Sequence, residues 1–282
     1  YILTAADITA MGQGSEILRV AQTDAAGNTS LVATRTIVVA TAPSVLSVAL
    51  SSATGVVNST LNIGDTVTAT VTFSESVAVN TTGGTPKLNL NIGDVAVAAN
   101  YASGSGTNAL TFIYTIASGQ TDSNGISIDV NSLYLDGGTI KDLVGNNASL
   151  AHTAVVDNDG YKVEAIAPTI TTPVAITSAT GVQNSLLSVG DTVTVTVNFS
   201  EAVTVTGTPQ LALNIGGTTV QADYASGSTT TELIFTYTIQ AGQTDTNGIS
   251  IAANALSLNS GTIQDLAGNA AMLTHSAVTD NS

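Results

Sequence analysis

Hydrophobic and polar residues alternate with a period of two along most of the chain. Residues at every second position of an extended strand face the same side, so each such run has one apolar and one polar face. The polar face is rich in Thr, whose branched Cβ favours the strand conformation. The clearest runs cover residues 67–73, 88–92, 110–116, 193–199, 211–215 and 233–239.

Turn-forming residues separate these runs. Gly-Gly, Gly-Asp and Asn-Gly pairs recur between them, and short strands with a turn every 8–12 residues are typical of an antiparallel sandwich. No 12-residue stretch has a convincing helical stripe, although Asn131–Leu135 and Asn254–Leu258 are predicted to form one short helical turn each. We therefore predict an all-β fold of antiparallel Ig-like β-sandwich domains in tandem, as an extended array.

The chain contains a long internal repeat. Gly64–Thr68 recurs as Gly190–Thr194, and residues 86–155 match residues 209–278 at 43 of 70 positions. A unit of about 120 residues fits one sandwich domain and is too long for a solenoid turn. Both copies begin near an Ala-Pro step. We predict a first repeat at residues 42–164 and a second at 165–282.

Residues 1–41 belong to neither repeat. They are predicted to form two strands, Ile17–Thr23 and Leu31–Val39, joined by the turn Asp24–Asn28. This pattern indicates the C-terminal hairpin of a truncated preceding Ig-like domain, and docking onto the first repeat is the alternative. Since Tyr1 is not a natural start, we expect the chain to be an internal piece of a longer protein.

Composition excludes several classes of function. The 282 residues carry a net charge of −15 with five Lys and Arg, which is unsuited to binding nucleic acid. The absence of Cys excludes disulfides and thiolate metal sites. No apolar run approaches the roughly 20 residues of a membrane span, so no membrane insertion is expected, and no signal peptide is recognisable.

We do not expect an enzyme. His152 and His275 occupy equivalent repeat positions, which favours a structural role, and no nucleophile-elbow, phosphate-loop or zinc-protease motif is present. A Lys–Asn isopeptide bond shared by both repeats is excluded because Lys87 and Lys141 are replaced by Gln in the second repeat.

Several motifs of the repeats carry a resemblance. The segment 189–201, followed by Gly242–Asp245, Asn247–Ile251 and Asp265–Asn269, resembles the bacterial Ig-like extender repeats of giant secreted RTX-type adhesins and the SwmB-like repeats of large bacterial surface proteins. The resemblance implies an extracellular, cell-surface array, often calcium-dependent, that spaces an adhesive tip from the cell and serves cell adhesion or biofilm formation.

Calcium is the cofactor that the acidic residues favour. Ca²⁺ prefers several hard oxygen ligands, and the acids here are mostly Asp at turns. A provisional strand assignment places Glu201 and Asp265 in loops at one end of the second repeat, and Asp65 and Asp122 in loops at one end of the first. Both ends would face the linker 157–160. The resulting candidate ligands are Asp157, Asp159, Glu201, Asp265, Asp122 and Asp65, with weaker, repeat-equivalent candidates at Glu75, Asp142, Asp245 and Asp280.

Each isolated motif also has a purely structural interpretation. Asp-x-x-Gly-Asn and Gly-Asp can be turns in which Asp accepts backbone N–H groups. At the linker, calcium is favoured because uncompensated carboxylates would repel one another. The first junction, residues 36–43, contains no acid, so calcium there is bound differently or is absent.

The predicted function is mechanical. The repeats act as spacers that project a distal adhesive domain, with calcium at a domain junction and neighbouring Ig-like domains of the same chain as partners. Two alternatives stay open: a surface module that binds a ligand such as glycan, and a self-associating subunit of an extracellular filament or sheath.

Overall fold

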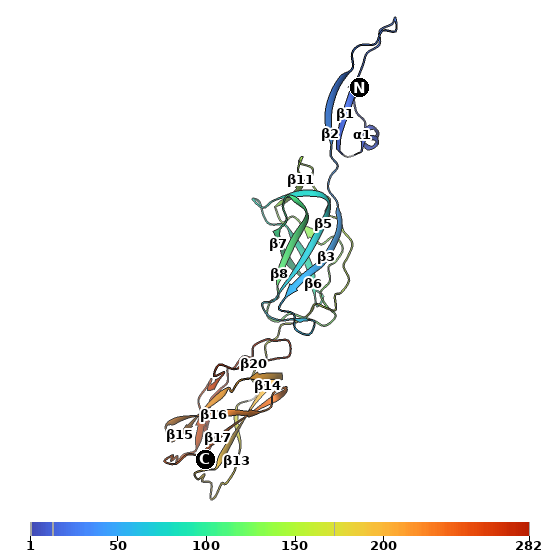
Figure 1. Cartoon of the computed structure of the whole chain (residues 1–282). Coiled ribbons are helices and arrows are strands. Elements are labelled where there is room, and N and C mark those ends of the chain that lie inside the picture. The colour runs from blue at the N-terminus through green and yellow to red at the C-terminus, as the bar shows by residue number, and fades with distance from the viewer. Residues whose placement is uncertain (1, 13, 172, 282) are drawn as a thin grey trace. The chain divides into compact units, whose positions relative to one another are not determined.

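The computed structural model describes residues 2–12, 14–171 and 173–281, and nearly all of its regular structure is β-strand (Figure 1). The chain divides into two compact units. The first comprises residues 1–52, 67–114 and 127–157, and the second comprises residues 53–66, 115–126 and 158–282.

The first unit holds a two-stranded sheet and a larger one. In the larger sheet the strand order is β10-β6-β7-β8-β5-β11, and β3 pairs with β5. The elements are α1 (Ala5–Met11), β1 (Gly14–Val20), β2 (Ala33–Val39), most of β3 (Val45–Thr54), nearly all of β5 (Thr66–Asn80), β6 (Lys87–Ile92), β7 (Val95–Ser103), nearly all of β8 (Thr107–Thr115), β10 (Leu133–Tyr134) and β11 (Thr139–Asp142).

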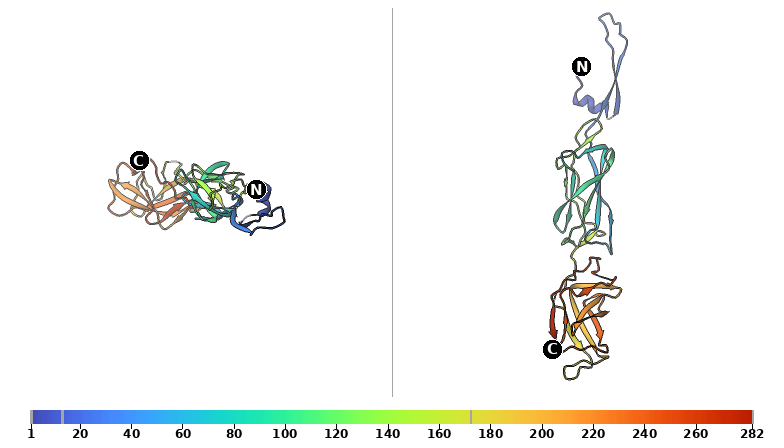
Figure 2. Two further views of the ribbon diagram at one scale, coloured as in Figure 1. Left: turned by 90° about the horizontal axis from the view of Figure 1, so that it is seen from above. Right: turned by 90° about the vertical axis from the view of Figure 1, so that its left-hand side faces the viewer.

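The second unit holds a three-stranded sheet of order β4-β12-β9 and a nine-stranded sheet. The larger sheet follows the order β13-β14-β17-β16-β15-β18-β21, with β19 on β15 and β20 on β14. Figure 2 shows these strands from two further directions. The elements are β4 (Thr60–Leu61), β9 (Thr121–Asp122), β12 (Lys162–Glu164), β13 (Ala175–Ala179), β14 (Thr192–Thr206), β15 (Gln210–Ile215), β16 (Thr218–Ser226), β17 (Thr230–Thr238), β18 (Ile249–Ile251), β19 (Leu256–Ser257), β20 (Thr262–Gln264) and β21 (Val278–Asn281).

The predicted alternation of apolar and polar positions is confirmed. Along β5, Val67, Ala69, Val71 and Phe73 are fully buried, while the Thr residues between them are half-buried. The equivalent residues of β14 form the core of the second unit together with Leu211, Leu213, Leu233 and Phe235. Antiparallel pairing dominates both large sheets, so the prediction of an all-β, antiparallel fold is confirmed.

The short helical turns predicted at Asn131–Leu135 and Asn254–Leu258 are wrong. Leu133 and Tyr134 form β10, which pairs with β6, and the equivalent Leu256 and Ser257 form β19, which pairs with β15. A histidine explains the extended backbone in the first case. The backbone N–H groups of Ser132 and Leu133 donate to His152 Nε2 at 2.9 and 3.3 Å, so they are not available to a helix.

The N-terminal segment forms the predicted hairpin with shifted bounds. Strands β1 and β2 pair from Gly14↔Val39 to Val20↔Ala33. The first strand is therefore Gly14–Val20 instead of the predicted Ile17–Thr23. The sequence pattern did not predict α1. Its signal is a capping box, in which Asp7 N donates to Thr4 Oγ1 at 3.2 Å and Thr4 N donates to Asp7 Oδ2 at 2.8 Å.

Candidate metal centre

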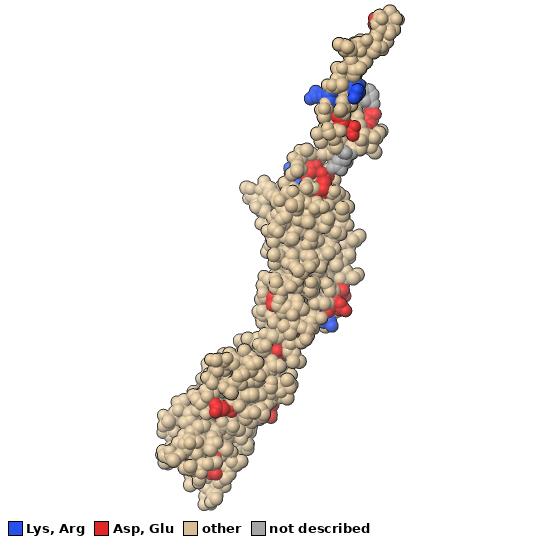
Figure 3. Space-filling view, viewed as in Figure 1, with Lys and Arg blue, Asp and Glu red and all other residues tan. Residues whose placement is uncertain are grey.

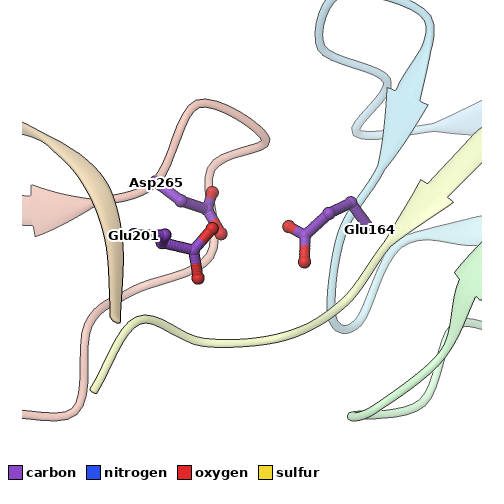
Figure 4. Close-up of side chains that lie close together, drawn as sticks. All are labelled: Glu164, Glu201 and Asp265. Carbon is purple, nitrogen blue, oxygen red and sulfur yellow. The ribbon is translucent and has the colours of Figure 1, made fainter. Parts of the chain in front are cut away.

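Three carboxylates converge in the second unit. Oxygen atoms of Glu164, Glu201 and Asp265 all lie within 4.8 Å of one another, and Figure 4 shows the three side chains turned toward a common point. They line part of a hollow of about 400 Å³. Among the described residues, these three are the one set of Asp, Glu or His side chains that lie close enough together to hold a single metal ion.

Each carboxylate is positioned by a different element. Glu164 ends β12, and Asp265 follows β20 directly. Glu201 lies within β14, so its predicted loop position is wrong. Strand β14 runs through Glu201 without a break, but it changes its pairing partner near this residue. Its pairing with β17 is interrupted between Asn198 and Val203, and its pairing with β20 begins at Thr204.

Asp265 is held by a tight turn. Its Oδ1 accepts hydrogen bonds from the backbone N–H groups of Gly268, at 2.7 Å, and Asn269, at 2.8 Å. Gly268 has φ +103, in the left-handed region that favours glycine. The predicted turn interpretation of Asp-x-x-Gly-Asn is therefore confirmed here, and the turn also presents the carboxylate of Asp265 toward the two glutamates.

The side chain of Asn269 connects two of the acids. Its Nδ2 donates to Asp265 Oδ2 at 2.8 Å and to Glu164 Oε2 at 2.7 Å, and it also donates to the backbone oxygen of Glu164 at 2.9 Å. Asn269 is 3% exposed and Asp265 is 4% exposed. A buried amide thus fixes the separation of these two carboxylates before any ion binds.

The mutual repulsion of Glu164, Glu201 and Asp265 favours a bound cation. Burial, together with a hydrogen bond to Asp265 and the negative charges of Asp265 and Glu201, raises the pKa of Glu164 to about 7. Burial and the charge of Asp265 also raise the pKa of Glu201. The chain carries few charges, and on the face drawn in Figure 3 the Asp and Glu residues form small separate groups. The convergence of three acids is therefore a local feature.

The donor set fits a hard cation. Ca²⁺ takes six to eight oxygen ligands at about 2.3–2.6 Å, and carboxylates supply one or two each while water completes the shell. Glu164, Glu201 and Asp265 offer six carboxylate oxygens. Four of these oxygens accept hydrogen bonds, which leave lone pairs for a metal. The set contains no nitrogen or sulfur ligand, which favours Ca²⁺ over Zn²⁺.

The other predicted ligands of the second unit lie outside this group and belong to turns. Asp65 Oδ2 accepts from Asn62 N at 2.8 Å, and Asp122 Oδ1 accepts from Gly125 N at 2.8 Å. Asp245 Oδ1 accepts from Gly248 N at 3.0 Å. Each of these carboxylates stabilises the turn that contains it.

The linker acids are not members of the group either. Asp157 and Asp159, the centre of the predicted site, fall on opposite sides of the boundary between the two compact units. Asp280 Oδ2 accepts a hydrogen bond from Asn247 Nδ2 at 2.6 Å, which ties β21 to the turn before β18.

The first repeat contains an incomplete counterpart of the centre. Glu75 and Asp142, the equivalents of Glu201 and Asp265, line a hollow of about 210 Å³ in the first unit together with Val39 and Ala40. The backbone position of Glu164 is taken by Ala40 in the first unit, because Asn146 Nδ2 donates to Ala40 O as Asn269 Nδ2 donates to Glu164 O. Among the described residues, Glu75 Oε1 is buried and has no hydrogen-bond partner.

Asp142 forms the same turn as Asp265. Its Oδ1 accepts from Gly145 N and Asn146 N at 2.7 and 2.8 Å. Burial acts to raise the pKa of Asp142, but these hydrogen bonds outweigh it and hold the pKa below its usual value. Asn146 Nδ2 donates to Asp142 Oδ2 at 2.7 Å and to Ala40 O at 3.3 Å, and within the described part of the chain it has no counterpart of the bond from Asn269 to the Glu164 carboxylate.

Sequence reasoning missed Glu164. It ends the predicted first repeat and was therefore grouped with that repeat, although it lies beside two acids of the second. The available signal was the comparison of the segments before the two Ala-Pro steps, because Glu164 precedes the second step whereas residues 36–43 contain no acid.

The histidines and two of the repeated tyrosines have structural roles. His152 Nε2 accepts backbone N–H groups while Nδ1 donates to Thr153 O at 2.8 Å, and His275 repeats the arrangement with Ala255 N and Ser276 O. Tyr101 and Tyr224 accept a backbone hydrogen bond at their hydroxyl groups and pack edge-on against Phe112 and Phe235. These rings hold loops and cores together.

Helix α1 has seven residues. Among the described residues, no helix is long and apolar enough to span a membrane.

Comparison with known proteins gives limited information. No family model matches the sequence, and no curated protein matches it. Among solved structures, the chain is similar to a 1.5-MDa bacterial ice-binding adhesin studied for host cell surface retention, with 14% identity, a TM-score of 0.36, and coverage of 98% of this chain and 76% of the other. It is also similar to a DUF4785 family protein from Legionella pneumophila subsp. pneumophila str. Philadelphia 1, with 12% identity, a TM-score of 0.22, and coverage of 75% and 52%.

Proposed function

We propose that this chain consists of spacer repeats of a large bacterial cell-surface adhesin, exposed outside the cell and rigidified by Ca²⁺. The repeats project a distal adhesive domain, hold distance and orientation, and catalyse nothing. The internal duplication and the antiparallel all-β fold support a tandem Ig-like array. The observation that carries the role of calcium is the convergence of Glu164, Glu201 and Asp265.

The position of Glu164 in the chain links metal binding to rigidity. Glu164 directly precedes residues 165–168, which connect the two predicted repeats, whereas Glu201 and Asp265 belong to the second repeat. A cation shared by all three carboxylates fixes this connecting segment to β14 and to the turn after β20. Without the cation, repulsion among the three charges opposes that arrangement.

Calcium titration of three matched proteins tests the proposal. By isothermal titration calorimetry, the wild type is expected to bind one equivalent more Ca²⁺ than Glu164→Gln. Ala40→Glu, which places a third acid beside Glu75 and Asp142 at the position that matches Glu164, is expected to gain an equivalent. Equal stoichiometry in the wild type and Glu164→Gln would refute the metal centre.

Small-angle scattering separates the spacer role from metal binding. The radius of gyration of the wild type is expected to change between chelator and calcium, and that of Glu164→Gln to respond less. Calcium binding without a change in the radius of gyration would retain the metal centre and refute its role in rigidity.

The glycan-binding alternative receives no support from the repeated tyrosines Tyr101 and Tyr224, since their hydroxyl groups and rings are engaged within the fold. The filament alternative is tested by sedimentation, in which a spacer repeat is expected to remain monomeric as its concentration rises.

A further inference from the structure

The loop Asn62–Asp65 of the first predicted repeat lies against a turn of the second repeat, within the second compact unit. Asn62 Nδ2 donates a hydrogen bond to Ala267 O at 3.0 Å, and Ile63 N donates to Asn269 Oδ1 at 2.9 Å. We call these two hydrogen bonds the docking contact. They join segments that lie about 200 residues apart in the sequence.

The loop is held in shape by its own hydrogen bonds. Asp65 Oδ2 accepts from Asn62 N at 2.8 Å, and Asp65 N donates to Asn62 O at 3.2 Å. Behind the loop, Gly64 N donates to Ile116 O at 3.0 Å, and Ile116 N donates to Asp65 O at 2.8 Å. Because the loop is fixed in this way, its docking costs little conformational freedom.

The turn is fixed as well. Asp265 Oδ1 accepts from the backbone N–H groups of Gly268 and Asn269, and Asp265 N donates to Asn269 O at 3.1 Å. Ala267 is 8% exposed and Asn269 is 3% exposed. The Nδ2 group of Asn269 donates to the acidic group, whereas its Oδ1 accepts the N–H of Ile63.

Glycine at position 268 allows the loop to approach the turn closely. A Cβ at Gly268 would lie 2.7 Å from Asn62 Nδ2. The equivalent Gly145 of the first repeat has nearly the same backbone, with φ +107 against +103, but a Cβ there would meet open space. The two glycines therefore share their backbone strain and differ in what packs against them.

The corresponding loop of the second repeat shows that the loop itself does not require Asn. Ser188 and Asp191 correspond to Asn62 and Asp65. Ser188 N donates to Asp191 Oδ2 at 2.6 Å, and Asp191 N donates to Ser188 O at 3.0 Å, so the same loop forms with Ser. The Ser hydroxyl lies one bond closer to the backbone than the Asn amide nitrogen, and it cannot replace that group in the docking contact.

We propose that the docking contact joins the two repeats without a metal ion and that Asn62 selects the partner of the loop. The partner is a turn that presents a backbone oxygen to the side chain of Asn62 and an amide oxygen to the N–H group of Ile63. Both hydrogen bonds join neutral groups, so neither requires a cation. A repeat with Ser at this position keeps the loop and loses the first of the two bonds. The proposal goes beyond calcium-dependent rigidity and stands without it.

Amide hydrogen exchange, measured by NMR on the full chain with excess chelator, tests the proposal. In the wild type, the amide of Ile63 is expected to exchange about tenfold more slowly than that of Val189, its equivalent in the second repeat. Asn62→Ala and Asn62→Ser are each expected to speed exchange at Ile63 about fivefold, because each removes one hydrogen bond of the docking contact. Ser188→Ala is the matched control and is expected to leave the rate at Ile63 unchanged.

Three results would overturn the proposal. The first is protection of Ile63 that appears only when calcium is added, and the second is equal exchange in the wild type and Asn62→Ala. The third is an Asn62→Ser variant that keeps the wild-type rate, because Asn62 would then select nothing. Absence of calcium binding in the titration would refute the metal centre and would not change the result expected in chelator.

The two glycines supply a second matched pair. Gly268→Ala and Gly145→Ala place the same strain on the backbone, but only Gly268→Ala puts a Cβ against Asn62. Exchange at Ile63 is expected to speed up at least about fivefold in Gly268→Ala and to stay unchanged in Gly145→Ala. Equal rates in the two variants would contradict the docking contact.

Discussion

Replacing Glu164 by Gln separates two effects of this residue: the free-energy cost of ionising its carboxyl group in the folded protein, and its contribution to binding a cation. A pKa of about 7 in place of the ordinary 4.5 means that the folded protein resists ionisation of this carboxyl group. At 1.36 kcal/mol per pKa unit the difference amounts to about 3.4 kcal/mol. Because the carboxylate is partly exposed, solvent screening reduces this to roughly 1–2 kcal/mol.

The sign of the pH dependence follows from the raised pKa. In the unfolded chain Glu164 loses its proton near pH 4.5, whereas in the folded, metal-free protein it keeps the proton until about pH 7. The folded state therefore loses stability as the pH rises from 4.5 to 7, and the full penalty is present above pH 7. If the proposed site takes Ca²⁺, calcium is expected to reverse this trend, because it would bind the ionised carboxylates.

Differential scanning calorimetry of the wild type and Glu164→Gln checks this reasoning. With chelator at pH 8, the variant is expected to be more stable by roughly 1–2 kcal/mol, a shift of about 2–8 °C for a unit of this size. At pH 4.5 the two should melt alike, and with excess calcium at pH 8 the order should reverse.

The control is Glu232→Gln, which removes one charge from an exposed position of β17. If Glu164→Gln gained no more stability at pH 8 than this control, or if calcium failed to reverse the order, the account of the acidic group would be refuted.

Further predictions concern stability and are read from chemical denaturation. His152→Ala is expected to cost about 1–3 kcal/mol, because it leaves the half-buried N–H group of Ser132 and the buried N–H group of Leu133 without their acceptor; a cost under about 0.5 kcal/mol would contradict this. Gly104→Ala is expected to cost more than about 2 kcal/mol, since φ is +107 and a Cβ would lie 2.0 Å from Ala109 O. Gly106→Ala, with φ +87 and open space around it, is the control and should cost clearly less.

The antiparallel all-β character of the fold was predictable because one periodicity dominates the chain. Alternate burial along β5 and β14 follows directly from the alternation of apolar residues with Thr or Asn that ends at Phe73 and Phe199, since each strand has one face on the core. The errors occurred where that pattern is absent. The Asn131–Leu135 segment has no period, and its extended form depends on His152, which lies some 20 residues later and could be placed only by the fold.

The candidate site was predictable in part for the same reason. Glu201 and Asp265 could be paired from their repetition in the first repeat as Glu75 and Asp142. The third acid could not be found in that way, because Glu164 has no acidic counterpart, and the change of partner along β14 that brings Glu201 to it leaves no signal in a regular strand pattern.

The duplication supplies its own control for deciding which residues fold the chain and which give it a function. Residues shared by the two repeats include the core of both large sheets, the histidines and the Asp-x-x-Gly-Asn turns, and each has a packing or hydrogen-bonding role in its own copy. Glu164 in place of Ala40 is a difference that the turn does not require, since the first unit forms the same turn without an acid there. Because the ionised carboxyl group of Glu164 is expected to cost stability, the comparison of the two copies singles out this residue as the one to test for the proposed cation.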